Sequence, residues 1–98
     1  MIPVPKPTRI HDEAWLDEIR AMPCCVCVHL NIQQLYVTDP NHTKTKGSGG
    51  GDDTAAPMCR LHHDEWHDIG KERFAQKYGI DPREVAKRLW AEKLARAF

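Results

Sequence analysis

The sequence lacks several features that would place it at once in a large class of proteins. It has no apolar run long enough to span a bilayer and no N-terminal apolar segment of the secretory kind. It has no excess of either charge, because 14 Lys and Arg side chains balance 14 Asp and Glu. Its one glycine run, residues 47–51, is not followed by the Gly-Lys-Ser/Thr of a phosphate-binding loop. We therefore expect a soluble cytoplasmic protein that does not bind a membrane.

The chain is also short for a protein without a stabilising cross-link. Its 98 residues predict one domain. A chain of this length buries a modest fraction of its surface, so a bound metal ion would help it fold. It contains four cysteines and six histidines. In an intracellular protein, closely spaced cysteines bind metal more often than they form disulfides.

The cysteines supply one predicted metal site. Cys24 and Cys27 form a Cys-x-x-Cys pair, whose two thiolates can reach a tetrahedral zinc from one tight turn. Cys59 and His62 form a second pair with the same spacing. Residues 28–58 must then fold as a hairpin that brings the two pairs together. The pattern predicts a structural Cys3His zinc site, and no βαβ pattern supports a redox dithiol instead.

The histidines that follow predict a second site. On a helix that begins near His62, His63 and His67 lie one turn apart on one face. His62 is rotated by about 100° from its neighbour His63, so the two side chains can point at different metal ions. Upstream, Asp39 and His42 offer a further carboxylate and imidazole.

Hydrophobic periodicity and breaker residues predict a small α+β domain. Trp15, Leu16 and Ile19 share one face of a helix that Asp12 can cap. The glycine run is expected to form a flexible surface loop. The expected helices cover residues 12–21, 62–69, 71–78 and 82–98, and the expected strands cover residues 34–38 and 55–58.

The same reading divides the chain into an arm, a core and a terminal helix. Residues 1–11 contain three prolines and are expected to be extended. Residues 12–79 form the zinc-containing core, and residues 80–98 form a helix that packs on the core or extends it. The apolar face of this helix comprises Val85, Ala86, Leu89, Trp90, Leu94, Ala97 and Phe98. Its other face is basic and is either an ordinary solvent-exposed surface or a contact to the DNA backbone.

The motifs follow one another in a characteristic order. They are Trp15-Leu16, Ile19-Arg20, Pro23-Cys24-x-x-Cys27, Asp39-Pro40-x-His42, Gly47-Ser48-Gly49, Asp53, Pro57-Met58-Cys59, His62-His63 and His67. This order resembles the HNH endonucleases of the ββα-metal superfamily, also called His-Me finger nucleases, over roughly residues 15–79. The likeness is greatest to small phage and prophage members with a structural zinc site, including the Ref type. Two departures are a Cys-x-x-His second zinc pair and the lack of an evident middle Asn, whose place lies nearest Asp53 or, less favoured, Asp52.

The resemblance implies a ββα-metal core, a pair of zinc knuckles, flanking helices, and hydrolysis of DNA phosphodiester bonds. His42 would be the general base, since an imidazole titrates near neutrality. His63 and His67 would bind a catalytic divalent cation, with Asp39 the favoured added carboxylate. Asp53 would ligate that metal or orient His42. A mixed nitrogen and oxygen site suits Mn²⁺, Ni²⁺, Co²⁺ or Zn²⁺ as well as Mg²⁺.

DNA is the implied partner, and phage packaging or recombination proteins are further ones. Lys44, Lys46 and Arg60 flank the site and are predicted to contact DNA. A monomer, which is favoured over a dimer, has one active site and would nick one strand at a time. Asn41 and Asp52 are alternatives for completing the metal site.

Two other functions, those of a zinc protease and of a non-catalytic zinc module, are alternatives to a nuclease. The segment from His63 to His67 superficially resembles the His-Glu-x-x-His of zinc proteases, but Glu65 lies about 200° around the helix from His63 and would face away from the metal. That interpretation is rejected. A non-catalytic zinc module that binds DNA or protein remains the alternative; it explains the Cys3His set and the basic terminal helix, but not His42.

Overall fold

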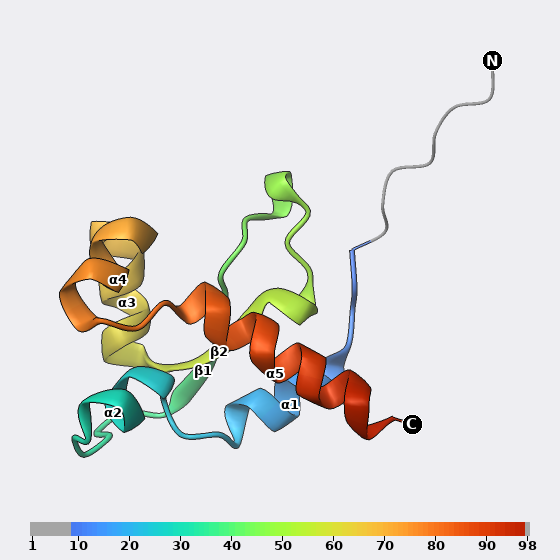
Figure 1. Ribbon diagram of the computed structural model, residues 1–98, viewed down its shortest axis with the longest axis horizontal. Coiled ribbons are helices and arrows are strands. Elements are labelled where there is room, and N and C mark those ends of the chain that lie inside the picture. The colour runs from blue at the N-terminus through green and yellow to red at the C-terminus, as the bar shows by residue number, and fades with distance from the viewer. Residues whose placement is uncertain (1–8, 98) are drawn as a thin grey trace.

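The centre of the fold is a short antiparallel sheet (Figure 1). The structure, a computed structural model, describes residues 9–97 except for the side chain of Lys46. Strand β1 (Thr38–His42) pairs with strand β2 (Ala55–Cys59) along its whole length, from Thr38 opposite Cys59 to His42 opposite Ala55. The predicted second strand is confirmed, and His42 is the last residue of the first.

Two prolines face each other in the middle of this sheet. Pro40 lies opposite Pro57. Neither has an N–H, so this pair occupies a position where antiparallel strands exchange no hydrogen bonds. Hydrogen-bonded and non-hydrogen-bonded pairs alternate along an antiparallel sheet. The Arg60 amide donates to the Val37 carbonyl at 3.2 Å, so the pair at Val37 is hydrogen-bonded and the pair three residues later, at Pro40, is not. The hydrogen-bonding edge of each proline therefore faces outward from the sheet.

Within the described residues, five α-helices surround the sheet, which confirms a small mixed α+β fold. Asp12 and Asp81 cap two of them, with each carboxylate accepting a backbone amide at 3.0 Å. Gly79, at φ 69°, ends another in the left-handed conformation that glycine tolerates. The helices are α1 (Glu13–Arg20), α2 (Cys25–Leu30), α3 (Arg60–Ile69), α4 (Lys71–Tyr78) and α5 (Pro82–Arg96).

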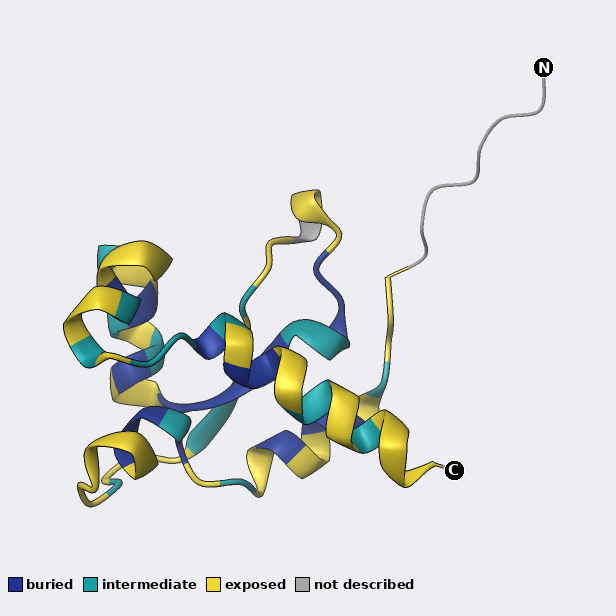
Figure 2. Ribbon diagram, viewed as in Figure 1, coloured by how far each residue is buried: buried dark blue, intermediate teal, exposed yellow. Residues whose placement is uncertain are grey.

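Buried residues are concentrated on β2 and recur along the helices around the sheet (Figure 2). One cluster joins Met58 of β2 to Trp66 of α3 and Phe74 of α4, and the two rings meet edge to face at 5.6 Å. The predicted apolar face of α1 is buried as expected, at Trp15, Leu16 and Ile19.

Helix α5 packs on the core through its first half and on α1 through its second half. Val85 and Ala86 are buried, and the Trp90 ring meets Trp15 of α1 at 5.8 Å. Leu94 is 45% exposed, so the predicted apolar face is only partly covered. Phe98 and most of the predicted N-terminal arm lie outside the described residues. Among the described helices, none is both long and apolar enough to cross a membrane.

The predicted strand at residues 34–38 is wrong. Only Thr38 of that stretch belongs to β1, while Leu35 and Val37 are 75% and 76% exposed. The strand instead runs through Asp39 and Pro40. The physical reason is the length of the partner: β2 ends at Cys59, so earlier residues have no strand to pair with despite their β propensity.

Three local predictions also need correction. The segment from Cys24 to Cys27 is the start of α2 rather than a tight turn, with Cys24 at the N-cap. Helix α3 begins at Arg60, two residues earlier than the His62 that we expected. The glycine run contains a short 3-10 turn, η1 (Lys46–Ser48), and is followed by another, η2 (Asp52–Thr54).

The glycine loop yields a test of this packing. A Cβ atom at Gly50 would lie 2.0 Å from the Lys44 carbonyl oxygen, whereas a Cβ atom at Gly47 would meet nothing within 4 Å. We expect Gly50→Ala to lower the free energy of unfolding by roughly 1–3 kcal/mol, as overpacking does. Gly47→Ala, the matched control, should leave it nearly unchanged. Chemical denaturation of both variants measures this, and equal stabilities would contradict the packing.

Candidate functional site

Four metal-ligating side chains converge between the sheet and α2. The Nδ1 atom of His62 lies 3.6 Å from the sulfur atoms of both Cys24 and Cys27, and 3.2 Å from that of Cys59. The Cys27 and Cys59 sulfur atoms are 4.0 Å apart, and all four ligand atoms lie within 4.8 Å of one another. The hairpin expected between the two pairs therefore does bring them together.

This spacing fits a tetrahedral ion. Zinc bonds of about 2.3 Å to sulfur and 2.0–2.1 Å to nitrogen place neighbouring ligand atoms roughly 3.5–3.8 Å apart. All four residues are buried. Burial raises the pKa of Cys27 to about 12 and lowers the pKa of His62, so without a cation the Cys27 thiol stays protonated and the His62 imidazole neutral. The group is compatible with a structural metal such as zinc.

The elements that carry the ligands explain the convergence. Cys24 and Cys27 lie at the first turn of α2, and Cys59 and His62 at the first turn of α3. Residues three apart on a helix lie on the same face, so each pair presents both ligand atoms in one direction. Cys25, between the first pair, is half-buried and is not part of the group.

Sequence reasoning missed Gln34, which supports the first pair. Its Oε1 atom accepts the Cys24 amide at 2.7 Å. Its amide nitrogen donates to the Tyr36 carbonyl at 2.7 Å and to the Thr38 hydroxyl at 2.8 Å. That hydroxyl in turn donates to the Met22 carbonyl at 2.7 Å. A lone glutamine in an irregular segment carries no sequence signal for this role.

Tyr78 of α4 covers the other side of the group. Its ring meets His62 edge to face at 5.3 Å. Its hydroxyl group hydrogen-bonds to Glu65, which also pairs with Lys77. Burial, and then the Glu65 carboxylate, raise the pKa of Tyr78, so the hydroxyl stays protonated as a donor. This contact encloses the His62 ring.

The helix histidines form a second cluster on α3. The Nε2 atoms of His63 and His67 are 3.1 Å apart, which is close to the spacing of two nitrogen ligands on one ion. The other ring nitrogen of His63, Nδ1, lies 3.4 Å from Asp39 Oδ2. Asp39 also pairs with Arg60 at 3.1 Å. Asp39 therefore lies on the Nδ1 side of the His63 ring, and the two Nε2 atoms meet on the other side.

The environment of His63 favours its neutral, ligating form. Burial lowers the pKa of His63, and the opposing effect of the Asp39 carboxylate does not cancel this. A proton on Nδ1, directed at Asp39, leaves the lone pair of Nε2 facing His67. The His67 side chain is exposed, so the pair opens to solvent on that side.

His42 is held by a different carboxylate from the one that we favoured. Its Nε2 atom lies 2.9 Å from Asp52 Oδ1, and the other Asp52 oxygen accepts the Asp12 amide at 2.6 Å. Burial would raise the pKa of Asp52, but the hydrogen bonds from His42 and Asp12 outweigh it and hold that pKa below its usual value. Among the described residues, Asp53 forms no hydrogen bond or ion pair with His42, and it lines a groove beside α5.

The structure does not join these clusters into one site. Asp39 and His42 are three residues apart on β1, so their side chains leave opposite faces about 10 Å apart along the strand. Among the described residues, only the Cys3His set gathers three or more metal-ligating side chains. Of the predicted DNA contacts, Arg60 is engaged with Asp39, Lys44 is exposed, and the side chain of Lys46 lies outside the described part.

Comparison with known families gives one match. Residues 1–96 match the family described as "Protein of unknown function (DUF968)". The chain belongs to the DUF968 family. No curated protein and no solved structure matches it.

The Cys3His group of this DUF968 protein offers a test with an internal control. Cys59→Ala should lose the metal and most of the folded structure, because the binding free energy of a structural zinc is largely folding free energy. Cys25→Ala, in the same segment but outside the group, should retain both. Metal analysis of the purified proteins and circular dichroism measure the two properties. Zinc retained at about one ion per chain in Cys59→Ala would contradict the assignment.

The Asp52 carboxylate predicts a pH dependence. Since its folded pKa is below the unfolded value of about 3.9, the stabilisation is present above that value and is lost as pH falls through the folded pKa. Asp52→Asn should therefore unfold more easily than wild type near pH 6, and this difference should shrink on acidification. Asp53→Asn is the control, for which we expect a smaller difference. A wild-type advantage that grows toward low pH would contradict this account.

Proposed function

We propose that this DUF968 protein is a metal-dependent DNA endonuclease of the HNH type with a structural zinc. The observation that carries the proposal is the arrangement of three histidines on one strand–strand–helix unit. His42 ends β1, while His63 and His67 follow the return strand on α3. The order of elements is that of a ββα-metal core, and the Cys3His group fixes the start of the helix.

Hydrolysis of a phosphodiester needs a base for the attacking water and stabilisation of the phosphate charge. His42 supplies the base. With its Nε2 proton donated to Asp52, its Nδ1 atom is free to take the proton from water. The Asp52 carboxylate stabilises the imidazolium that forms, as a carboxylate within hydrogen-bond distance does.

His63 and His67 are the residues that would hold the divalent cation, through their Nε2 atoms. When bound, such a cation supplies charge stabilisation at the phosphate and at the departing 3′ oxygen. Asp39 fixes the ring of His63 and makes Nε2 the ligating atom. Two protein ligands leave coordination positions for phosphate oxygens and water. A chain with one such site would nick one strand at a time.

In this nuclease, His42 and the His63–His67 pair must act on the same phosphate. The side chains of Asp39 and His42, however, leave opposite faces of β1. His42 is the last residue of its strand, and its side chain is 41% exposed, so a bound strand can reach its ring while Asp52 holds it. The exposed His67 side chain leaves the other half of the site equally accessible.

A non-catalytic zinc module that binds DNA or protein is the second candidate. One observation favours it: the second cluster provides only two histidines and an orienting carboxylate, and it does not form a group of three ligands among residues 9–97. Metal stoichiometry separates the two candidates. One tightly held zinc indicates the module, and a second, exchangeable divalent ion indicates the nuclease.

Three variants test the assigned roles. His42→Ala should retain the fold and both metals but lose about 10²–10⁴-fold in cleavage rate, the usual contribution of a general base. His63→Ala and His67→Ala should lose the exchangeable metal together with activity, and should keep the zinc. The measurements are plasmid cleavage across a series of divalent metals and calorimetric titration with Mn²⁺ after loosely bound ions are removed.

The control is His29→Ala, an exposed imidazole on α2 that belongs to neither cluster. It should cleave as wild type does. If His42→Ala loses the second metal while His63→Ala keeps it, the two roles are reversed. If every variant cleaves DNA at the wild-type rate, or the wild type cleaves none with any metal, the nuclease assignment fails and the zinc module replaces it.

A further inference from the structure

A groove of about 750 Å³ runs between α5 and the loop that joins the two strands. One wall is formed by residues that directly follow the His42–Asp52 pair along the chain, namely Thr43 and Lys44 on one side and Asp53 and Thr54 on the other. The Thr43 hydroxyl donates to the Thr54 carbonyl at 2.8 Å and closes this wall. The groove therefore begins beside the residue that we propose as the catalytic base.

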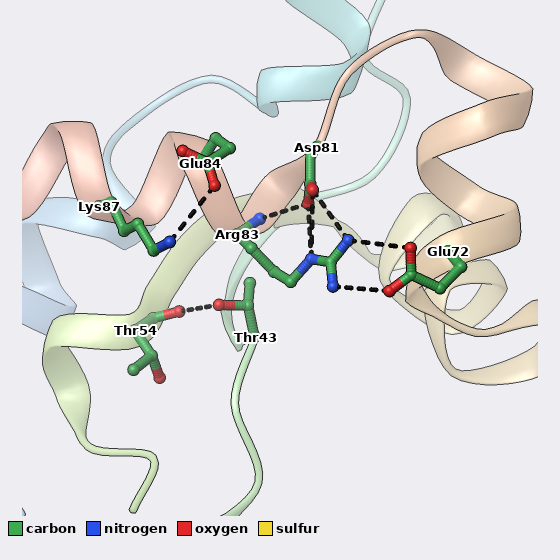
Figure 3. Close-up of polar contacts among 7 residues, drawn as sticks. All are labelled: Thr43, Thr54, Glu72, Asp81, Arg83, Glu84 and Lys87. Atoms are coloured by element: carbon green, nitrogen blue, oxygen red, sulfur yellow. Dashed lines mark hydrogen bonds and ion pairs between the residues drawn. The ribbon is translucent and has the colours of Figure 1, made fainter. Parts of the chain in front are cut away.

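The charges along the groove fall into two groups. Figure 3 shows Arg83 and Lys87 of α5 near this wall, where both are already paired. Arg83 contacts Asp81 and Glu72, each at 2.9 Å, and Lys87 contacts Glu84 at 3.3 Å.

The remaining charges are unpaired. Among the described residues, Lys44, Lys71 and Asp53 line the groove without an ion pair. The two lysines are exposed, so both can approach an anionic ligand.

The floor of the groove is apolar and includes one aromatic ring. Trp90 lies there together with Ala86, Ala91 and Leu94. Its ring is held by the edge-to-face contact with Trp15 and by the Lys93 ammonium, 4.8 Å from its centroid. Because the Lys93 ammonium lies over one face of this half-buried ring, a planar group can stack only on the opposite face.

We propose that this groove binds an unpaired stretch of the DNA strand next to the bond that is cut. The proposal deepens the nuclease function, on which it rests, by naming DNA with a single-stranded segment as the substrate. Lys44 and Lys71 contact phosphates, and a base stacks on Trp90. The volume lies within the roughly 300–1,000 Å³ typical of small-ligand pockets, which suits a nucleotide. A duplex keeps its bases stacked inside and cannot place one on Trp90 without flipping it out.

The test measures binding without cleavage, so it does not depend on the nuclease activity. Oligothymidylate of about twelve nucleotides is titrated into the zinc-containing protein with no added divalent cation, and tryptophan fluorescence is followed. Trp15 and Trp66 are only 1% and 6% exposed, so quenching reports on Trp90. A blunt duplex of equal length serves as the competing ligand. We expect saturable quenching by the single strand and weaker binding of the duplex.

Two variants locate the site. Lys44→Ala/Lys71→Ala should weaken binding of the single strand about tenfold at moderate salt, and should reduce the salt slope by about 1.4, since each phosphate contact on a single strand contributes about 0.7. Arg88→Ala removes a charge from α5 outside the groove and is the matched control, with a smaller loss. Trp90→Leu should abolish quenching, and its melting temperature shows whether it folds.

Each result decides the proposal. It is overturned if the single strand causes no quenching, if the double lysine variant binds as Arg88→Ala does, or if the duplex binds as tightly and depends on the same lysines. If the single strand binds in the groove but no added metal ion gives cleavage, the groove proposal stands and the nuclease proposal fails. If the protein cleaves DNA but binding does not depend on the groove, the nuclease proposal stands and the groove proposal fails.

Discussion

The convergence of three sulfur atoms and one imidazole nitrogen is the contact on which the rest of this small domain depends. The four ligands lie at the starts of two helices whose N-cap residues, Cys24 and Cys59, are 35 residues apart in sequence. A metal ion such as zinc would cross-link the N-termini of α2 and α3. The domain would then be stable with a smaller apolar core. Gln34 adds to this because it links the Cys24 amide to the Thr38 hydroxyl of β1.

The same convergence sets the rotation of α3 about its axis. Successive residues on a helix are about 100° apart. Because His62 is directed inward by its partners, its neighbour His63 must emerge beside β1, where Asp39 meets it at 3.4 Å. His67 then follows one turn later on the same face. In the proposed nuclease, the structural site therefore aims the histidines of the catalytic site without taking part in the reaction.

Local features of the sequence predicted the parts of the fold that depend on short-range physics. The cap at Asp12 is read from a single residue, and α1 begins directly after it. The Cys3His set was predictable because a tetrahedral metal site imposes a characteristic spacing on its ligands. Features that depend on pairing partners far along the chain were not predictable. The strand was misplaced because the end of β2 decides where β1 can pair. Asp52 was ranked below Asp53 because the short η2 turn, which residue patterns do not reveal, decides which carboxylate faces His42.

The facing prolines of the sheet have a consequence for assembly. An exposed strand edge normally offers a row of donors and acceptors to which another chain can add. Here Pro40 and Pro57 each remove the donor from the middle of an outer edge, and each strand is only five residues long. A third strand would lack its central hydrogen bond on either side. The sheet is thus limited to two strands by its own sequence, which protects the protein from edge-to-edge aggregation even where helices leave the edges open.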